Sequence, residues 1–90
     1  MTSLPNIQQL FDENNLDKAL DVLNRFIEEN PQDDNGYFMR GKLWWRLQKH
    51  SAAVTDYETA VALNPDSEAR HALDLARRVF DYFNPDLLNP

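Results

Sequence analysis

The chain of 90 residues contains no cysteine, only two glycines and no long hydrophobic run. Without cysteine, neither a disulfide nor a thiolate metal site can form, and a reducing compartment is compatible with the sequence. No apolar run approaches the ~18 residues that a membrane-spanning helix requires, and the start Met-Thr-Ser-Leu-Pro-Asn lacks the basic and apolar parts of a signal peptide. We therefore expect a cytoplasmic protein with no membrane partner.

Positive charge is also scarce, because fifteen acids face nine lysines and arginines and give a net charge of −6. The bases are concentrated: residues 37–50 hold four bases and no acid, while residues 1–36 hold eight acids and two bases. The acidic balance argues against a nucleic-acid partner, since phosphates require a concentrated positive surface. The basic segment does contain aromatic residues, as proteins that bind single-stranded nucleic acid do. A binding test with labelled single strands therefore distinguishes a nucleic-acid partner from a protein partner.

Motifs that would carry chemistry are missing from the sequence. His50 and His71 lie at the starts of different predicted helices, and there is no glycine-rich phosphate loop and no nucleophile with a base at a recognisable spacing. The acids follow no calcium-loop spacing. The sequence predicts that the chain is not an enzyme and has no catalytic residue, no cofactor and no metal site.

Helical periodicity runs through the whole chain. The five prolines stand near expected helix boundaries, and between them apolar residues recur every three or four positions. The links are too short for neighbouring helices to separate, so consecutive helices should pack antiparallel. The predicted fold is all-α, with helix N-caps at Asn15, Asp33, Ser51, and Asp66 or Ser67, and with five helices over residues 3–13, 16–29, 33–48, 51–63 and 67–83.

A period of 34 residues relates two parts of the sequence: Asn30-Pro31 returns as Asn64-Pro65, and Ala19 returns as Ala53. A single helix pair cannot bury its apolar face alone, so a fixed period of this length indicates stacked helix pairs. The last predicted helix is amphipathic, as expected of a helix that caps such a stack. Its apolar face holds Ala69, Ala72, Leu73, Ala76, Val79, Phe80 and Phe83.

The pattern Tyr37-x2-Arg40-Gly41-x2-Trp44, followed by Ala53-x3-Tyr57, Ala60 and Pro65, resembles the tetratricopeptide repeat, a helix–turn–helix unit of 34 residues. In that pattern Gly41 and Ala53 are small where the two helices cross, and aromatic residues fill the space around them. Residues 1–33 carry a weaker copy, in which Ile7 replaces the glycine and the other matches are Leu10, Ala19, Leu23, Phe26 and Pro31.

The resemblance implies a short right-handed α-solenoid of antiparallel helix pairs in a single domain over residues 1–90. Its parts would be a first repeat over about 1–33, a second over about 34–67, a capping helix over about 67–83 and a tail over 84–90. It also implies a protein-interaction module that acts by binding, without chemistry.

In members of the family, the first helix of each repeat lines a concave groove, and the resemblance places five groove residues on the second repeat: Asn35, Phe38, Lys42, Trp45 and Arg46. Such a basic and aromatic strip suits a peptide that carries carboxylates and an apolar side chain, because guanidinium groups grip carboxylates and Trp supplies contact area. The corresponding positions elsewhere are Leu4, Gln8, Phe11 and Asp12 in the first repeat, and Ala69, Ala72, Ala76, Val79 and Phe80 in the cap. Chaperone-binding members use a polar carboxylate clamp, whose places are taken here by Leu4, Gln8, Met39, Ala69 and Leu73, so we do not expect a chaperone tail as ligand.

Several alternatives stay open. Trp44 is expected to be structural, whereas Trp45 either packs against the capping helix or faces a ligand. Arg40 is expected to pair with an acid of a neighbouring helix. Two repeats fall below the usual three, so the rival hypothesis is a homodimer that buries the surface around Leu4, Ile7 and Phe11, or the tail. The tail, with Leu87 and Leu88, could also occupy the groove of its own chain or the groove of a second copy.

Overall fold

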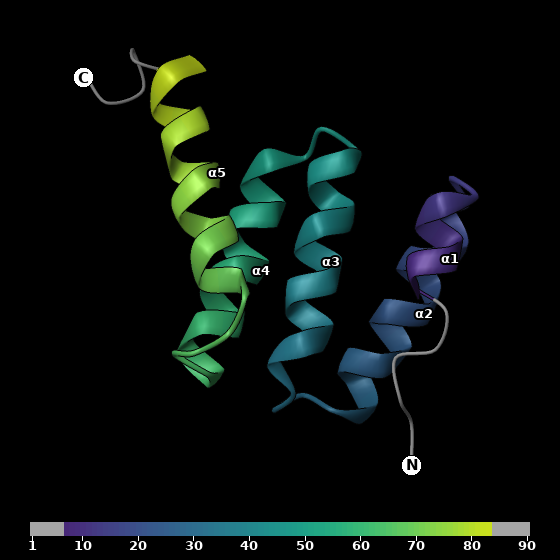
Figure 1. Cartoon of the computed structure of the whole chain (residues 1–90). Coiled ribbons are helices and arrows are strands. Elements are labelled where there is room, and N and C mark those ends of the chain that lie inside the picture. Colours follow the sequence, from purple (N-terminus) through teal and green to yellow (C-terminus); the bar gives the residue numbers. More distant parts are fainter. Residues whose placement is uncertain (1–6, 84–90) are drawn as a thin grey trace.

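The computed structural model describes residues 7–83, with side chains as far as Val79. It contains five helices, α1 (Ile7–Asp12), α2 (Leu16–Glu29), α3 (Asp34–Arg46), α4 (His50–Leu63) and α5 (Ala69–Phe83), and no strand within this range. Each helix packs against the next one along the chain and runs in the opposite direction, with α1 and α2 at one end of the row and α5 at the other (Figure 1). The all-α prediction with antiparallel neighbours is confirmed.

The helix bounds agree with the sequence pattern within two residues wherever both ends are described. The bounds of α2 are as predicted, while α3 ends at Arg46 instead of residue 48, and α5 begins at Ala69 instead of residue 67. The helix α4 begins one residue early, at His50. The first residues of the predicted helix 3–13 and the tail 84–90 lie outside the described residues.

The turns inside the two helix pairs have the same backbone conformation. Asn14 and Gln48 are 34 residues apart and adopt left-handed φ angles of 58° and 64°. The next residues, Asn15 and Lys49, donate their backbone N–H to a carbonyl five residues earlier, at 2.8 Å in both turns. This bond closes a Schellman motif, which ends a helix by reversing the chain. The 34-residue period therefore extends from the residue types to the backbone.

Of the predicted N-caps, Asp33 and Ser67 make a capping hydrogen bond, Asn15 stands at the N-cap position of α2 without one, and the prediction of Ser51 is wrong. The Asp33 carboxylate accepts the backbone N–H two residues later at 2.9 Å, and the Ser67 hydroxyl accepts the N–H of the first residue of α5 at 3.0 Å. Asn15 makes no side-chain hydrogen bond at the start of α2. Ser51 lies inside α4, because the Schellman turn delivers the chain into the helix at His50.

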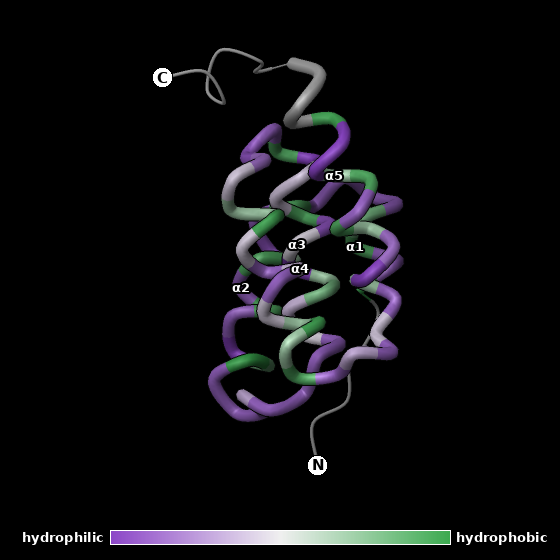
Figure 2. Tube along the Cα trace, turned by 90° about the vertical axis from the view of Figure 1, so that its left-hand side faces the viewer, coloured by the Kyte–Doolittle hydropathy of each residue, from purple (hydrophilic) through white to green (hydrophobic). Residues whose placement is uncertain are grey.

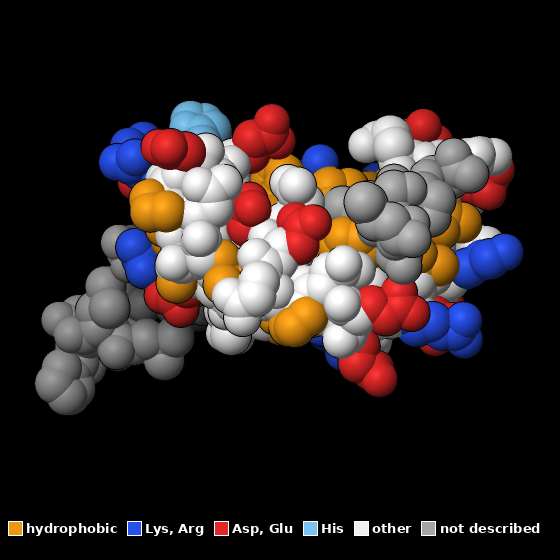
Figure 3. Space-filling view, turned by 90° about the horizontal axis from the view of Figure 1, so that it is seen from below, with side chains coloured by type: hydrophobic (Ala, Val, Ile, Leu, Met, Phe, Trp, Pro, Cys, Tyr) orange, Lys and Arg blue, Asp and Glu red, His pale blue; other side chains and the backbone are white. Residues whose placement is uncertain are grey.

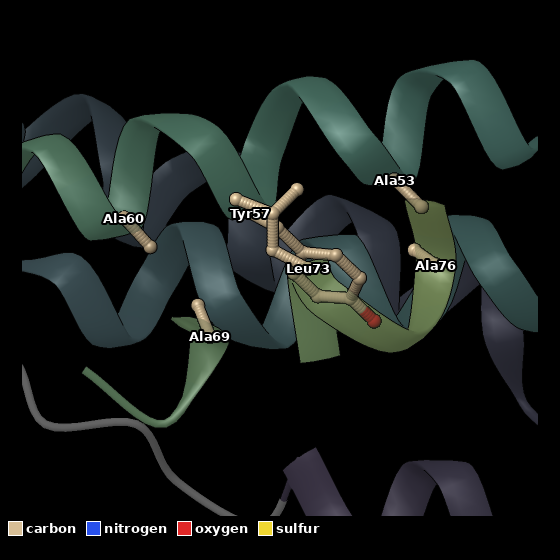
Figure 4. Packing of buried hydrophobic residues seen from close by; sticks show 6 residues of the cluster. All are labelled: Ala53, Tyr57, Ala60, Ala69, Leu73 and Ala76. Carbon is tan, nitrogen blue, oxygen red and sulfur yellow. The ribbon is translucent and has the colours of Figure 1, made fainter. Parts of the chain in front are cut away.

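The core consists of two clusters of buried side chains. One joins α4 to α5, where alanines let the helices approach closely around Tyr57 and Leu73 (Figure 4). The other joins α1, α2 and α3 around Phe11, Leu23 and Leu43. Hydrophobic positions alternate with hydrophilic ones along each helix, as the banded colours of the chain trace show (Figure 2). The two clusters meet across α3, which contributes side chains to both.

Two glycines mark close helix approaches. A Cβ atom on Gly41 would lie 2.5 Å from the Tyr57 ring, a distance that real side chains do not adopt, so the interpretation of Gly41 as a crossing residue is confirmed. Gly36 plays the same part between α2 and α3, where a Cβ would lie 2.9 Å from the side chains of Phe26 and Ile27. This second close approach was not predicted from the sequence.

Arg40 pairs with Asp56 of α4, so the expected pairing with an acid of a neighbouring helix is confirmed. The Arg40 guanidinium donates from Nε to Asp56 Oδ2 at 2.7 Å and from Nη2 to Oδ1 at 2.9 Å. The indole of Trp44 donates to Asp56 Oδ2 at 2.9 Å, and Arg40 Nη1 donates to Asn24 Oδ1 at 2.9 Å. These bonds connect α2, α3 and α4, and the hydrogen bond to Asp56 raises the pKa of Arg40. Trp44 is structural, as expected.

Large hydrophobic side chains are covered over most of the described surface. Seen from below, hydrophobic atoms show only in small patches between acids and other polar groups (Figure 3). Ile7 and Phe11, which the homodimer hypothesis placed at an interface, are already 3% and 2% exposed within the chain. Leu4 and the tail, the other parts of that hypothesis, lie outside the described residues. Within the described range, no helix has the length and apolar character needed to cross a membrane.

Candidate functional site

Three of the five predicted groove residues, Lys42, Trp45 and Arg46, line one surface hollow of about 370 Å³. Lys42 and Arg46 are one helical turn apart on α3, so their side chains project from the same face. Gln8 and Phe11 of α1 form the opposite side of this hollow. We call it the basic hollow.

A second hollow of about 410 Å³ is also lined by Trp45. It is predominantly apolar and is closed by α5; its lining residues are Trp45, Tyr57, Ala72, Leu75, Ala76, Arg78 and Val79. Trp45 and Tyr57 line both hollows, so the two adjoin and form one groove that extends from α1 to α5. We call the second part the apolar hollow, and the two together the Trp45 groove.

The two cations of the basic hollow lie over aromatic rings. The ammonium of Lys42 is 5.4 Å from the centre of the Phe38 ring, and the guanidinium of Arg46 is 5.5 Å from the centre of the Phe11 ring. Neither cation forms an ion pair with any carboxylate of the described residues. In an acidic chain, two unpaired cations side by side create a local positive field that favours a negatively charged ligand.

Trp45 both packs within the fold and lines the surface hollows. Its ring stacks on His50 at the start of α4, with ring centres 4.1 Å apart and planes inclined by 31°, and it packs beside the α4–α5 core cluster. The same residue lines both hollows. The indole is therefore held in a fixed position while part of its surface faces the groove.

Tyr57 lies at the junction of the two hollows, since it lines both. The residue is only 5% exposed, and the hydroxyl forms no hydrogen bond with another described residue. Burial, followed by the charge of the neighbouring Asp56, raises the pKa of Tyr57 to about 12. The phenol therefore keeps its proton at neutral pH and can act as a hydrogen-bond donor.

The structure places the other two predicted residues outside the hollows. The Phe38 ring lies 6.2 Å from the Tyr57 ring and beneath Lys42, so it supports two groove residues without lining the hollows itself. Asn35 is exposed in the first turn of α3, where its backbone N–H donates to the capping carboxylate of Asp33. Of the five residues, Asn35 is the one that the structure does not associate with the groove.

Some groove residues escaped the sequence analysis. Tyr57 was interpreted as a packing residue alone, while Leu75 and Arg78 were not placed in the groove. One signal was available for Leu75, because it is an apolar residue on the charged side of an amphipathic helix. It is 47% exposed, which marks it as the exposed large hydrophobic residue of the described surface. Among the described residues, no cluster of His, Asp or Glu could hold a metal ion.

Three features define this chain as a helical-repeat protein. Its helix pairs pack in a row, its sequence and its turns repeat after 34 residues, and the first helix of a pair lines a groove. Comparison with known proteins agrees with this class. The tetratricopeptide repeat family profile matches residues 35–67. The chain belongs to the tetratricopeptide repeat family, whose fold is typically a non-catalytic interaction module.

Two curated relatives contain matching segments. The chain is 39% identical over 70 residues to a UDP-N-acetylglucosamine–peptide N-acetylglucosaminyltransferase of Giardia intestinalis, and 32% identical over 82 residues to tetratricopeptide repeat protein 16 of Mus musculus. These matches cover 78% and 91% of the chain but only 4% and 11% of the two relatives. The chain thus spans a small part of each, and the transferase activity in the first name belongs to that whole protein.

One solved structure has nearly the same extent as this chain. The solution structure of Bacteroides fragilis protein BF1650 is similar with a TM-score of 0.87 and 29% identity, covering 99% of this chain and 91% of that one. The likeness confirms the all-α helical-repeat fold.

Proposed function

We propose that the chain is a protein-interaction module that binds a segment of a partner protein in the Trp45 groove. Tetratricopeptide repeats generally mediate protein–protein interaction, which supports the class of function. The proposed ligand is a peptide with an acidic residue next to a large apolar residue. The carboxylate would be bound by Lys42 and Arg46, and the apolar side chain would occupy the hollow between Trp45 and α5.

The observation that carries this proposal is the pair of unpaired cations beside an apolar hollow. An acidic side chain would supply the counter-charge that Lys42 and Arg46 lack within the described chain. An apolar side chain would cover Leu75, the large hydrophobic residue that is otherwise exposed to water. Charge gives such a site its orientation and association rate, and the buried apolar anchor gives most of its affinity.

The test is binding of a library of short acetylated and amidated peptides, each with one Asp or Glu and one Leu, Phe or Trp at varied spacing. We expect the wild-type protein to select acidic–apolar sequences, measured by fluorescence anisotropy at low and high salt. The variant Lys42→Glu/Arg46→Glu should lose this binding, and Trp45→Ala should weaken it for every sequence. Circular dichroism must show unchanged helicity in both variants.

A matched control is available on α2. The variant Lys18→Glu/Arg25→Glu changes the net charge by the same amount, and both residues are exposed and remote from the hollows. It should bind the selected peptides like the wild-type protein. Equal losses in the two charge variants would show a general charge effect and would remove the support for a groove site.

A binding module with an open groove is expected to sediment as a monomer of 10.5 kDa. The homodimer hypothesis makes the opposite prediction, because a dimer that must form in order to fold melts at a temperature that rises with protein concentration. Thermal unfolding over a wide concentration range therefore separates the two.

A further inference from the structure

The Tyr57 hydroxyl is a groove feature that packing does not explain. The ring is required, because it fills the space against Gly41 and packs in the cluster with Leu73 (Figure 4). The oxygen is not required for this, since phenylalanine has the same ring. In Figure 4 the oxygen extends past Leu73 on the side of Ala76, one of the residues that line the apolar hollow.

The hydroxyl forms no hydrogen bond with another described residue. Buried polar groups in proteins nearly always have a hydrogen-bond partner. Every fully buried polar side-chain atom in the described part of the chain does have a partner. The remaining exposure of Tyr57 must therefore include its oxygen, at the surface of the groove that the residue lines.

We propose that the Tyr57 hydroxyl donates a hydrogen bond to a backbone carbonyl of the bound peptide. This inference rests on the function proposed above and adds a specificity-determining residue to it. The carbonyl is the one that lies between the acidic residue, held by Lys42 and Arg46, and the apolar residue seated against α5. Tyr57 would thereby fix the position of the peptide along the groove.

The location of Tyr57 is what favours a backbone carbonyl as the acceptor. The residue lines both hollows, so it faces the stretch of peptide that must cross from one to the other. The carboxylate of the ligand has two cations available in the basic hollow, and the apolar side chain has no acceptor. The peptide backbone is the group that remains to be satisfied as it crosses the buried wall. The donor is carried by a side chain that packs closely against Gly41, in a residue that is only 5% exposed.

The test compares two substitutions that each remove one phenolic hydroxyl. Tyr57→Phe removes the hydroxyl without a partner, whereas Tyr37→Phe removes one that donates to the Pro31 carbonyl at 3.1 Å. The probe is the tightest-binding acidic–apolar peptide of the library. Tyr57→Phe should weaken its binding roughly 3- to 15-fold and leave the melting temperature unchanged or higher, as expected for the loss of one net hydrogen bond to the ligand. Tyr37→Phe should lower the melting temperature and leave binding unchanged.

A second probe locates the acceptor. Replacing single peptide bonds of the probe by esters in successive positions changes one backbone carbonyl at a time into a weaker acceptor. At one position between the acidic and the apolar residue, the ester should weaken binding to the wild-type protein but add no further loss with Tyr57→Phe. Such coupling is not expected from a merely structural role of the hydroxyl.

The outcomes separate the two proposals. If Lys42→Glu/Arg46→Glu abolishes binding while Tyr57→Phe binds like the wild-type protein, the role of Tyr57 is overturned and the groove stands. If no library peptide binds to the wild-type protein, both are overturned. If Tyr57→Phe weakens binding but every ester position behaves alike in the two proteins, the hydroxyl does not donate to a backbone carbonyl.

Discussion

The guanidinium of Arg40 holds both carboxylate oxygens of Asp56, at 2.7 and 2.9 Å, and the Asp56 side chain is 6% exposed. This two-point bond connects α3 to α4, and Trp44 shares the same carboxylate. A buried charge is tolerated only when it is paired and hydrogen-bonded. The three side chains therefore act as one polar unit inside the helix pair, and removal of Asp56 takes the shared acceptor from both Arg40 and Trp44.

We predict that Asp56→Ala destabilises the protein by about 3–5 kcal/mol, the range measured when one partner of a buried ion pair is removed. The reason is that Arg40 keeps its charge while it loses its acceptor, and the indole N–H of Trp44 loses its acceptor too. The measurement is urea unfolding followed by circular dichroism.

The control is Asp21→Ala, which breaks the exposed pair with Arg25 and should change stability by less than about 1 kcal/mol. The double variant Arg40→Met/Asp56→Ala should be more stable than the sum of its single changes predicts, because no uncompensated charge is left. Equal effects of Asp56→Ala and Asp21→Ala would show that the buried network contributes no more than a surface pair.

Ala53→Leu tests the crossing of α3 and α4. Ala53 is fully buried in the cluster with Tyr57, so a larger side chain must displace its neighbours and should cost about 1–3 kcal/mol. Ala62→Leu, at an exposed position of the same helix, introduces the same side chain and should be close to neutral. Thermal unfolding of the two variants compares them directly. A neutral Ala53→Leu would mean that the helices do not cross at this residue.

The sequence could predict this crossing because its physical requirement is local and sharp. Only small residues fit where two helix backbones meet, so Gly41 and Ala53 leave a recognisable spacing with the aromatic residues around them. The pairing of Arg40 was predictable for a similar reason, because a charged residue at a partly buried position requires an acidic partner.

The groove itself was less predictable, because it depends on how α5 lies against α3. The apolar hollow combines Trp45 with Leu75 and Val79, residues that are far apart in the sequence and share no spacing rule. The second close approach, at Gly36, joins two different helix pairs, so no spacing within one repeat predicts it. The role of the Tyr57 hydroxyl could not be predicted from the sequence, because the pattern at this position requires only a packed aromatic ring.

Gln48→Gly should stabilise the protein. Gln48 ends the helix α3 with a φ of 64°, a left-handed conformation that costs a side-chain-bearing residue roughly 1 kcal/mol relative to glycine. The equivalent change in the first turn, Asn14→Gly, should have a smaller effect, because asparagine tolerates this conformation better. Urea unfolding of both variants tests the order. A loss of stability in Gln48→Gly would show that its side chain contributes more than the strain that it causes.

The raised pKa of Tyr57 predicts a specific loss of stability in alkali. The pKa of the phenol is about 12 in the folded protein against an ordinary value of 10.0, so above pH 10 the unfolded chain releases this proton before the folded one does. The folded state then binds more protons than the unfolded state, and stability falls as the pH rises from 10 towards 12. The contribution is fully present below pH 10.

Tyr57→Phe removes this titration and should therefore reduce the alkaline loss, while lysines and the other tyrosines affect both proteins alike. The difference in free energy of unfolding between wild type and variant, measured by urea unfolding at neutral pH and again above pH 10, should shift in favour of the variant. Ultraviolet absorbance of the folded protein should show one tyrosine that ionises late and is missing from the variant. If the difference in stability is the same at both pH values, the Tyr57 hydroxyl titrates as it would in water and is not held in the buried wall of the groove.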